Sequence, residues 1–188
     1  MVVETKISNE TLTEFFYKKL DKVNKKSLCP LPQEFMLYSS EVLNQYALTQ
    51  NFFNTKENGE VSQKVLGVNL LEAFHRPEAE RKRIFKDVGD SVLVQLGFFK
   101  TDQAKRAPSR SYYLQLGRSA YNQMESLDCR FYDIPHFYKQ MATSLDSILK
   151  VIKATSESLN FKSLEEYLLD GSHNSDLFLN FQNSDKAS

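Results

Sequence analysis

Two segments decide the fold: VGDSVLVQLGFF at residues 88–99 and RSYYLQLGRSAYNQME at residues 110–125. The first contains only an aspartate, a serine and a glutamine among apolar residues and glycines, which is typical of a buried helix. Pro77 favours a helix start upstream of it, because the missing N–H of proline would have no partner in the first turn. We therefore predict a helix over residues 77–99 that is buried in its second half, from Val88 on.

The second segment predicts a helix from about Ser109, with small and aromatic residues at helical spacing. Glycine or alanine on facing stripes allows two helix backbones to approach closely. We expect such contacts at Gly89, Gly97 and Gly117, and hence a central, buried helix pair.

The rest of the chain predicts further helices and little sheet. Thr11 and Glu14 have the spacing of a capping box, and either Asp133 or Ile134 is expected to cap the helix that follows Pro135. The expected helices cover residues 9–24, about 32–53, 66–74, 135–158 and 163–171, with a polar loop at 54–63. The sequence thus predicts an all-α, single-domain helical bundle of about six or seven helices over residues 1–171, followed by a polar tail, 172–188.

Composition narrows the classes of function. Lysine plus arginine equals aspartate plus glutamate at 24 each, so the chain lacks the net positive field on which nonspecific nucleic-acid binding depends. We expect no nucleic-acid partner. The sequence contains no signal-peptide pattern and no apolar run of membrane-spanning length, which predicts a cytoplasmic protein without integral membrane association.

Catalytic and metal motifs are not found in the sequence. The three histidines, His75, His136 and His173, stand alone, and the chain has no H-E-x-x-H, phosphate-binding glycine loop or G-x-S-x-G elbow. We therefore assign no catalytic residue, no metal ligand and no cofactor.

Asp90 is the polar residue of most interest, because a carboxylate in an apolar helix is costly unless it is paired. Arg118, Tyr112 and Tyr113 are candidate partners, and the group is either a structural link between two helices or an orienting group in a pocket. The candidate ligand or structural centre comprises Asp90, Gly89, Gly97, Tyr112, Tyr113, Gly117, Arg118 and Tyr121.

Two further features concern partners. The polar tail contains four large apolar residues that need burial, on the same chain, on a second copy or on another protein: Leu177, Phe178, Leu179 and Phe181. The end of the first helix carries a run of lysines that is either a solvated helix end or a basic patch for phosphate or membrane: Lys18, Lys19, Lys22, Lys25 and Lys26.

The chain also resembles a known family over residues 43–155. The residues that carry the resemblance are Val88-Gly89-Asp90, then Gly97-Phe98-Phe99, then Tyr112-Tyr113 with Gly117, Ala120 and Tyr121. They resemble an uncharacterised bacterial family of deltaproteobacterial type, whose members read H-[IL]-G-D, G-x-F and Y-Y-x-x-x-G-x-x-[AS]-Y. This chain has Asp87-Val88 where the family often has a histidine. The resemblance supports the helical fold and implies no particular activity.

These observations favour a non-catalytic protein-interaction or regulatory module that self-associates as a homo-oligomer or binds a protein partner. One alternative is a helical bundle that binds a small apolar or amphipathic ligand between its helices. Another is an enzyme that uses Asp90 and tyrosines as acid–base groups.

Overall fold

The structure is a computed structural model that describes residues 11–46, 53–55, 61–63, 65–98 and 109–159. Within these residues the chain forms six α-helices, one π-helical turn and one two-stranded hairpin. The helices are α1 (Leu12–Asn24), α2 (Gln33–Tyr46), α3 (Leu66–Ala73), α4 (Glu78–Leu93), α5 (Arg110–Ser126) and α6 (Phe137–Ser158). The π-helical turn η2 (Val94–Phe98) extends α4, and the antiparallel hairpin consists of β1 (Phe53–Thr55) and β2 (Val61–Gln63). The prediction of an all-α helical bundle is confirmed.

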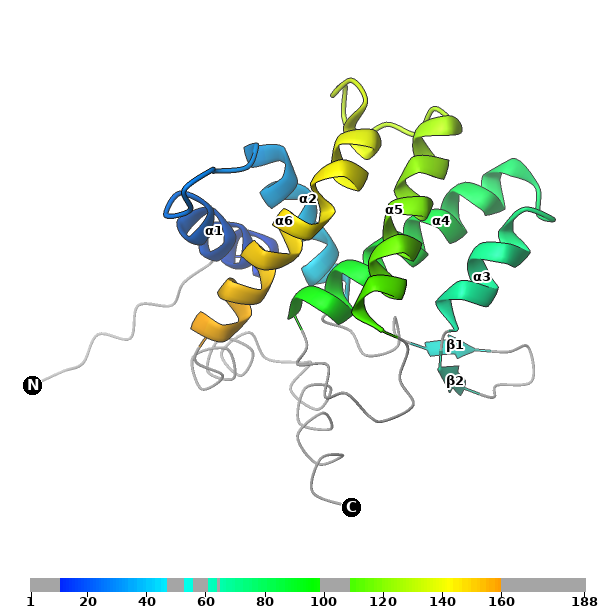
Figure 1. Ribbon diagram of the computed structural model, residues 1–188, viewed down its shortest axis with the longest axis horizontal. Helices are drawn as coiled ribbons and strands as arrows, with labels where there is room; N and C mark the ends of the chain where they lie inside the picture. The colour runs from blue at the N-terminus through cyan, green and yellow to red at the C-terminus, as the bar shows by residue number, and fades with distance from the viewer. Residues whose placement is uncertain (1–10, 47–52, 56–60, 64, 99–108, 160–188) are drawn as a thin grey trace, which may run out of the picture.

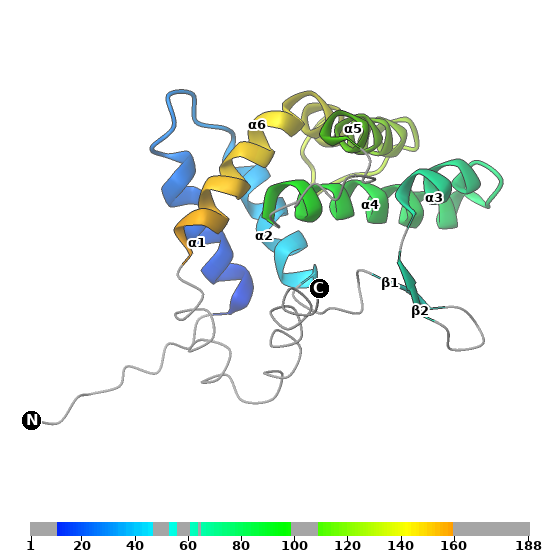
Figure 2. The same ribbon diagram turned by 60° about the horizontal axis from the view of Figure 1, so that its bottom comes forward.

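The helices are arranged as a row, with α3 at one end and α1 with α2 at the other (Figures 1 and 2). Helices α4 and α5 lie side by side, α3 contacts the outer side of α4, and α6 lies between α5 and α1. The first half of the chain therefore forms both ends of the row, and its second half completes the middle.

The core confirms that α4 is buried in its C-terminal half. Every residue from Val88 to Val94 is buried, including the two polar residues Asp90 and Ser91. The largest fully buried side chains come from five of the six helices: Phe16, Leu20, Met36, Tyr38, Phe85, Leu93, Tyr121, Phe137, Met141, Leu145, Ile148 and Leu149. A single core thus joins all six helices, and α3 contributes to it through Leu66, Leu70 and Ala73.

Local signals define several helix starts as expected. The Thr11 N–H donates to Glu14 Oε2 at 3.0 Å and the Glu14 N–H to Thr11 Oγ1 at 3.2 Å, which confirms the capping box. Ser109 caps α5 by accepting from the Tyr112 N–H at 3.3 Å.

Three predicted boundaries are wrong. Helix α2 ends at Tyr46 within the described residues, and Phe53 pairs with Gln63 in β1 and β2, where a helix end and a polar loop were predicted. Aromatic and β-branched residues favour strands, and helical spacing of apolar residues does not exclude one. Helix α6 is capped by His136 instead of Asp133 or Ile134, because the preceding loop turns through left-handed residues. The predicted helix 163–171 and the tail 172–188 lie outside the described residues.

Candidate functional site

Asp90 is the centre of the candidate site, and it is almost completely buried, at 1 % exposure. Its Oδ1 accepts hydrogen bonds from the Tyr38 hydroxyl at 2.7 Å and the Tyr121 hydroxyl at 3.1 Å. Its Oδ2 accepts from the ammonium group of Lys86, one turn earlier in α4. We call these four residues the Asp90 cluster. The prediction that Asp90 is buried and bonded across to α5 is confirmed, and the same carboxylate also holds α2.

The predicted partners of Asp90 are wrong, because the tyrosine that reaches it from α5 is Tyr121. Tyr121 lies nine residues after Tyr112, and at about 100° per residue this places the two on opposite sides of α5. Tyr112 is 42 % exposed, and its hydroxyl lies against Gly67 of α3. Tyr113 is half-buried and pairs with the Tyr112 ring at 5.6 Å between centroids. Arg118 is half-buried as well, and its Nε has no hydrogen-bond partner in the described structure.

Two members of the Asp90 cluster were missed by sequence reasoning. Lys86 precedes Asp90 by four residues, and this i, i+4 spacing of opposite charges in one helix was a usable signal. Tyr38 lies 52 residues away from Asp90 in sequence. The sequence alone contains no signal for that contact, because it depends on how α2 packs across α4.

The three glycines lie at tight helix contacts, but each faces a large side chain, so the predicted close approach of two helix backbones is not seen at them. A Cβ atom on Gly89 would lie 2.7 Å from Tyr121 Cε1, and one on Gly117 would lie 2.9 Å from Val92 Cγ1. A Cβ on Gly97 would lie 2.8 Å from Ile152 Cγ2, so this glycine faces α6 instead of α5. Gly89 therefore gives the Tyr121 ring the room that it needs to bring its hydroxyl to Asp90.

Burial determines the protonation chemistry of the Asp90 cluster. Burial raises the pKa of the Asp90 carboxyl above its ordinary value, while the Lys86 charge and the two tyrosine hydrogen bonds act in the opposite direction. Burial, together with the nearby Asp90 charge, raises the pKa of Tyr38 and Tyr121 well above the ordinary tyrosine value. Both hydroxyls therefore stay protonated and act as hydrogen-bond donors.

A second polar link ties α2 to α4 one turn away. The Tyr46 hydroxyl lies 2.9 Å from Asp87 Oδ1, 3.2 Å from the Asp87 carbonyl oxygen and 2.9 Å from Ser91 Oγ. Burial raises the pKa of Tyr46 as well, so it too remains protonated. Two tyrosines of α2, eight residues apart, thus bond to neighbouring turns of α4 and determine the register between the two helices.

Aromatic rings surround the Asp90 cluster. The Tyr38 ring lies 5.0 Å from that of Phe131, 5.2 Å from that of Phe137 and 5.9 Å from that of Tyr138, measured between centroids. The Tyr121 ring stacks on Tyr138 at 6.1 Å. Rings from α6 and the preceding loop thus exclude water from the carboxylate, which strengthens its hydrogen bonds.

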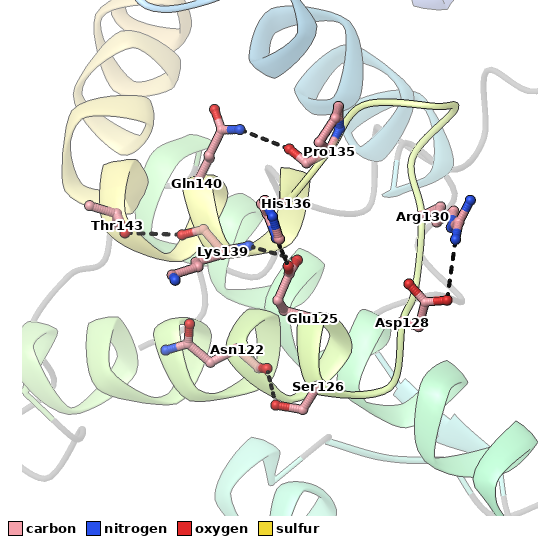
Figure 3. A network of polar contacts seen from close by, with 10 residues as sticks. All are labelled: Asn122, Glu125, Ser126, Asp128, Arg130, Pro135, His136, Lys139, Gln140 and Thr143. Carbon is pink, nitrogen blue, oxygen red and sulfur yellow. Dashed lines mark hydrogen bonds and ion pairs between the residues drawn. The ribbon is translucent and has the colours of Figure 1, made fainter.

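The connection from α5 to α6 is held by polar contacts at the surface (Figure 3). Asp128, Tyr132 and His136 all have left-handed backbone conformations, with φ near 50°. Glu125 on α5 accepts from the Lys139 N–H at 3.4 Å and lies 2.7 Å from His136 Nδ1. Its carboxylate thus satisfies an N–H of the first turn of α6 from the neighbouring helix.

Helix α3 carries an exposed apolar face. Its inner side is buried, while its outer side presents large apolar residues at intervals of three: Val65 at 59 %, Val68 at 47 %, Leu71 at 69 % and Phe74 at 48 % exposure. Asn69 and Glu72 are the only polar residues of α3. We call these four residues the α3 face. A helix that is apolar on both sides is usually buried on both sides.

Comparison with known proteins adds no relative: no protein-family model, curated protein or solved structure matches the chain. The resemblance to a bacterial family therefore stays a prediction, and so does the role of the residues that it highlights. Among the residues that the structure describes, no group of three histidine, cysteine, aspartate or glutamate side chains is placed to hold a metal ion. No helix in the same residues has the length and apolar character needed to cross a bilayer.

Proposed function

We propose that this protein is a non-catalytic interaction module that associates with a second copy of itself through the α3 face. The observation that carries the proposal is the stripe of four large, partly exposed apolar side chains on a helix that is already buried on its other side. The Phe74 ring also packs against that of Phe85 at 5.5 Å between centroids. Burying a fully exposed side chain of this kind contributes about 1.5–3 kcal/mol, and these four side chains, at 47–69 % exposure, would each contribute roughly half of that. A second surface that covers the stripe therefore gains free energy from each of the four.

The charges beside the α3 face suit a second copy. In a two-fold symmetric dimer the same surface meets itself, so a surface of one sign would repel its partner. Glu72 and Arg76, both exposed, supply one acid and one base at the end of α3. The chain as a whole has a formal net charge of zero, so no long-range repulsion opposes the approach. Helix α3 also lies at the end of the row of helices, where a neighbour can reach it (Figure 1).

The Asp90 cluster supports the non-catalytic part of the proposal. The Asp90 carboxylate accepts hydrogen bonds from two buried tyrosines and from the partly exposed Lys86, and aromatic rings surround it. These contacts connect α2, α4 and α5, which is the work of a structural link. They favour this role over the alternatives of an acid–base group or an orienting group for a small ligand, because either would have to present the carboxylate to another molecule.

Co-purification of two differently tagged copies tests the proposal. When both are expressed together, capture of one tag should recover the other copy. Leu71→Glu places a charge in the middle of the α3 face and should abolish recovery. Because Leu71 is 69 % exposed, the substitution leaves the core intact. Leu28→Glu is the matched control, since Leu28 is 103 % exposed and lies in the connection from α1 to α2.

Failure to recover the second copy with the parent protein would contradict the proposal. Equal recovery with Leu71→Glu would show that the copies associate through another surface. If Leu71→Glu and Leu28→Glu both abolished recovery, the cause would be a general effect of added acidic charge.

A further inference from the structure

The corner formed by α1 and its connection to α2 combines positive charge with an exposed apolar tip. Five lysines are exposed along the last turns of α1 and just beyond it: Lys18, Lys19, Lys22, Lys25 and Lys26. Their spacing of three and four residues places them on one side of the helix, opposite the buried Phe16 and Leu20. We call these lysines, together with Leu28, the basic corner.

The positive charge of the basic corner is local. Between residues 18 and 34 the five lysines are accompanied by only two acids, Asp21 and Glu34, whereas the whole chain is formally neutral. Asp21 forms an ion pair with Lys25 at 2.6 Å, within the lysine group itself. Lys19, Lys22 and Lys26 therefore give this end of the molecule a positive field that the zero net charge of the whole chain conceals.

The loop that carries Leu28 is closed by a buried side chain. Asn24 is 2 % exposed, and its amide donates to the Leu31 carbonyl oxygen and accepts from the Leu31 N–H, both at 2.8 Å. Asn24 thus holds the two ends of the loop together and fixes Leu28 near its middle. Leu28 is 103 % exposed, two residues from Lys26, so their Cα atoms lie within about 7 Å of each other. Figure 2 shows this connection at the edge of the molecule, beyond the helices.

We propose that the basic corner binds peripherally to an anionic phospholipid surface. Lysines beside a membrane are attracted to the negative surface potential of acidic lipids. A fully exposed leucine among them enters the boundary between headgroups and acyl chains, while lysine side chains extend their ammonium groups towards the phosphates. The proposal rests on the basic corner alone and is independent of the α3 face.

Leu28 decides between a lipid surface and a nucleic acid. A polyanion such as RNA would also be attracted by the lysines, but contacts to a phosphate backbone gain nothing from an isolated leucine. The corner also presents no exposed aromatic ring on which a base could stack: the aromatic residues of α1 are Phe15, Phe16 and Tyr17, and all are buried or half-buried.

Co-sedimentation with vesicles tests the proposal. The parent protein should bind vesicles of phosphatidylcholine that contain about one third phosphatidylserine and should not bind pure phosphatidylcholine. Binding should be lost between about 0.1 M and about 1 M salt, because the screening length falls from about 10 Å to about 3 Å. Lys22→Gln with Lys26→Gln should weaken binding about 25-fold, since each lysine contributes about fivefold. Leu28→Ser should weaken it about tenfold at unchanged charge.

The matched control is Arg83→Gln with Lys139→Gln, which removes the same charge from exposed positions on α4 and α6 and should leave binding unchanged. Equal binding to neutral vesicles, or equal weakening by the control, would overturn the proposal. It would also be overturned if Leu28→Ser bound the anionic vesicles as well as the parent does. Salt-sensitive binding to a single-stranded oligonucleotide, without binding to vesicles, would assign the lysines to nucleic acid instead.

Discussion

Removing the acceptor of the Asp90 cluster should destabilise the protein far more than removing its charge. Asp90→Leu removes the carboxylate that accepts from both the Tyr38 and Tyr121 hydroxyls, and each buried donor left unsatisfied costs about 1–3 kcal/mol. The loss is partly offset, because a buried carboxylate no longer has to be desolvated and Lys86, at 39 % side-chain exposure, can turn to water. We expect a net loss of about 2–4 kcal/mol in the free energy of unfolding.

Asp90→Asn retains an oxygen that accepts from the two tyrosines, so its free energy of unfolding should lie within about 1 kcal/mol of the parent. Urea unfolding followed by circular dichroism measures both variants, and this signal suits a helical chain that has no tryptophan. Asp146→Leu is the control. It removes a surface carboxylate that pairs with Arg110 and Lys150, and we expect a loss below about 1 kcal/mol.

A double-mutant cycle makes the test sharper. Tyr38→Phe should destabilise the parent, because it removes a buried hydrogen bond. In the Asp90→Leu background, Tyr38→Phe should lower the free energy of unfolding by less, or even raise it, because it removes an unsatisfied donor. Strictly additive effects, or Asp90→Leu as stable as Asp90→Asn, would refute the claim that this carboxylate holds three helices together.

Three further predictions concern pH, packing and the tail. Because the pKa of Asp90 is raised on folding, the folded state binds the carboxyl proton more tightly than the unfolded state does. The stabilisation that this proton provides is fully present below the ordinary pKa of 3.8 and is lost as pH rises through the folded pKa. The stability of Asp90→Asn relative to the parent should therefore increase with pH above about 4 and then level off, and a flat difference would contradict the raised pKa. Gly89→Ala should lower the free energy of unfolding by about 1–3 kcal/mol, because its Cβ meets the Tyr121 ring. Gly67→Ala is the control, since its Cβ meets only the hydroxyl end of the exposed Tyr112. Equal melting temperatures for the two variants would contradict the claim that Tyr121 packs tightly on Gly89. Truncation after Gly171 should lower either the melting temperature or the oligomeric mass, and no change in either would show that the apolar residues of the tail contribute to neither.

The helices could be predicted from the sequence because their signals are local. The capping box at Thr11, the start of α5 at Ser109 and the buried apolar half of α4 all depend on residues within a few turns of one another. The start of α6 was predicted at residue 135 and lies at Phe137. Its capping could not be predicted, because a carboxylate that satisfies its first turn comes from Glu125 on another helix.

The candidate site was predictable only in part for the same reason. An aspartate within an apolar helix indicates a buried pair, and that prediction is confirmed for Asp90. The identity of its partners depends on the rotation of α5 and on the position of α2, which helical periodicity does not determine. The sequence therefore indicates only that Tyr38 is an aromatic residue of the core, although its hydroxyl makes the shorter of the two tyrosine hydrogen bonds to the Asp90 carboxylate. The α3 face was missed because exposure depends on which side of a helix the rest of the fold leaves uncovered.

The mass of the protein in solution tests its self-association most directly. Sedimentation velocity over about 1–100 μM, a range that covers dimers of about micromolar affinity, should show the parent passing from monomer to dimer. Leu71→Glu should remain a monomer throughout, while Leu28→Glu should follow the parent. A parent that is monomeric at every concentration, or a Leu71→Glu variant that dimerises as the parent does, would contradict self-association through the α3 face.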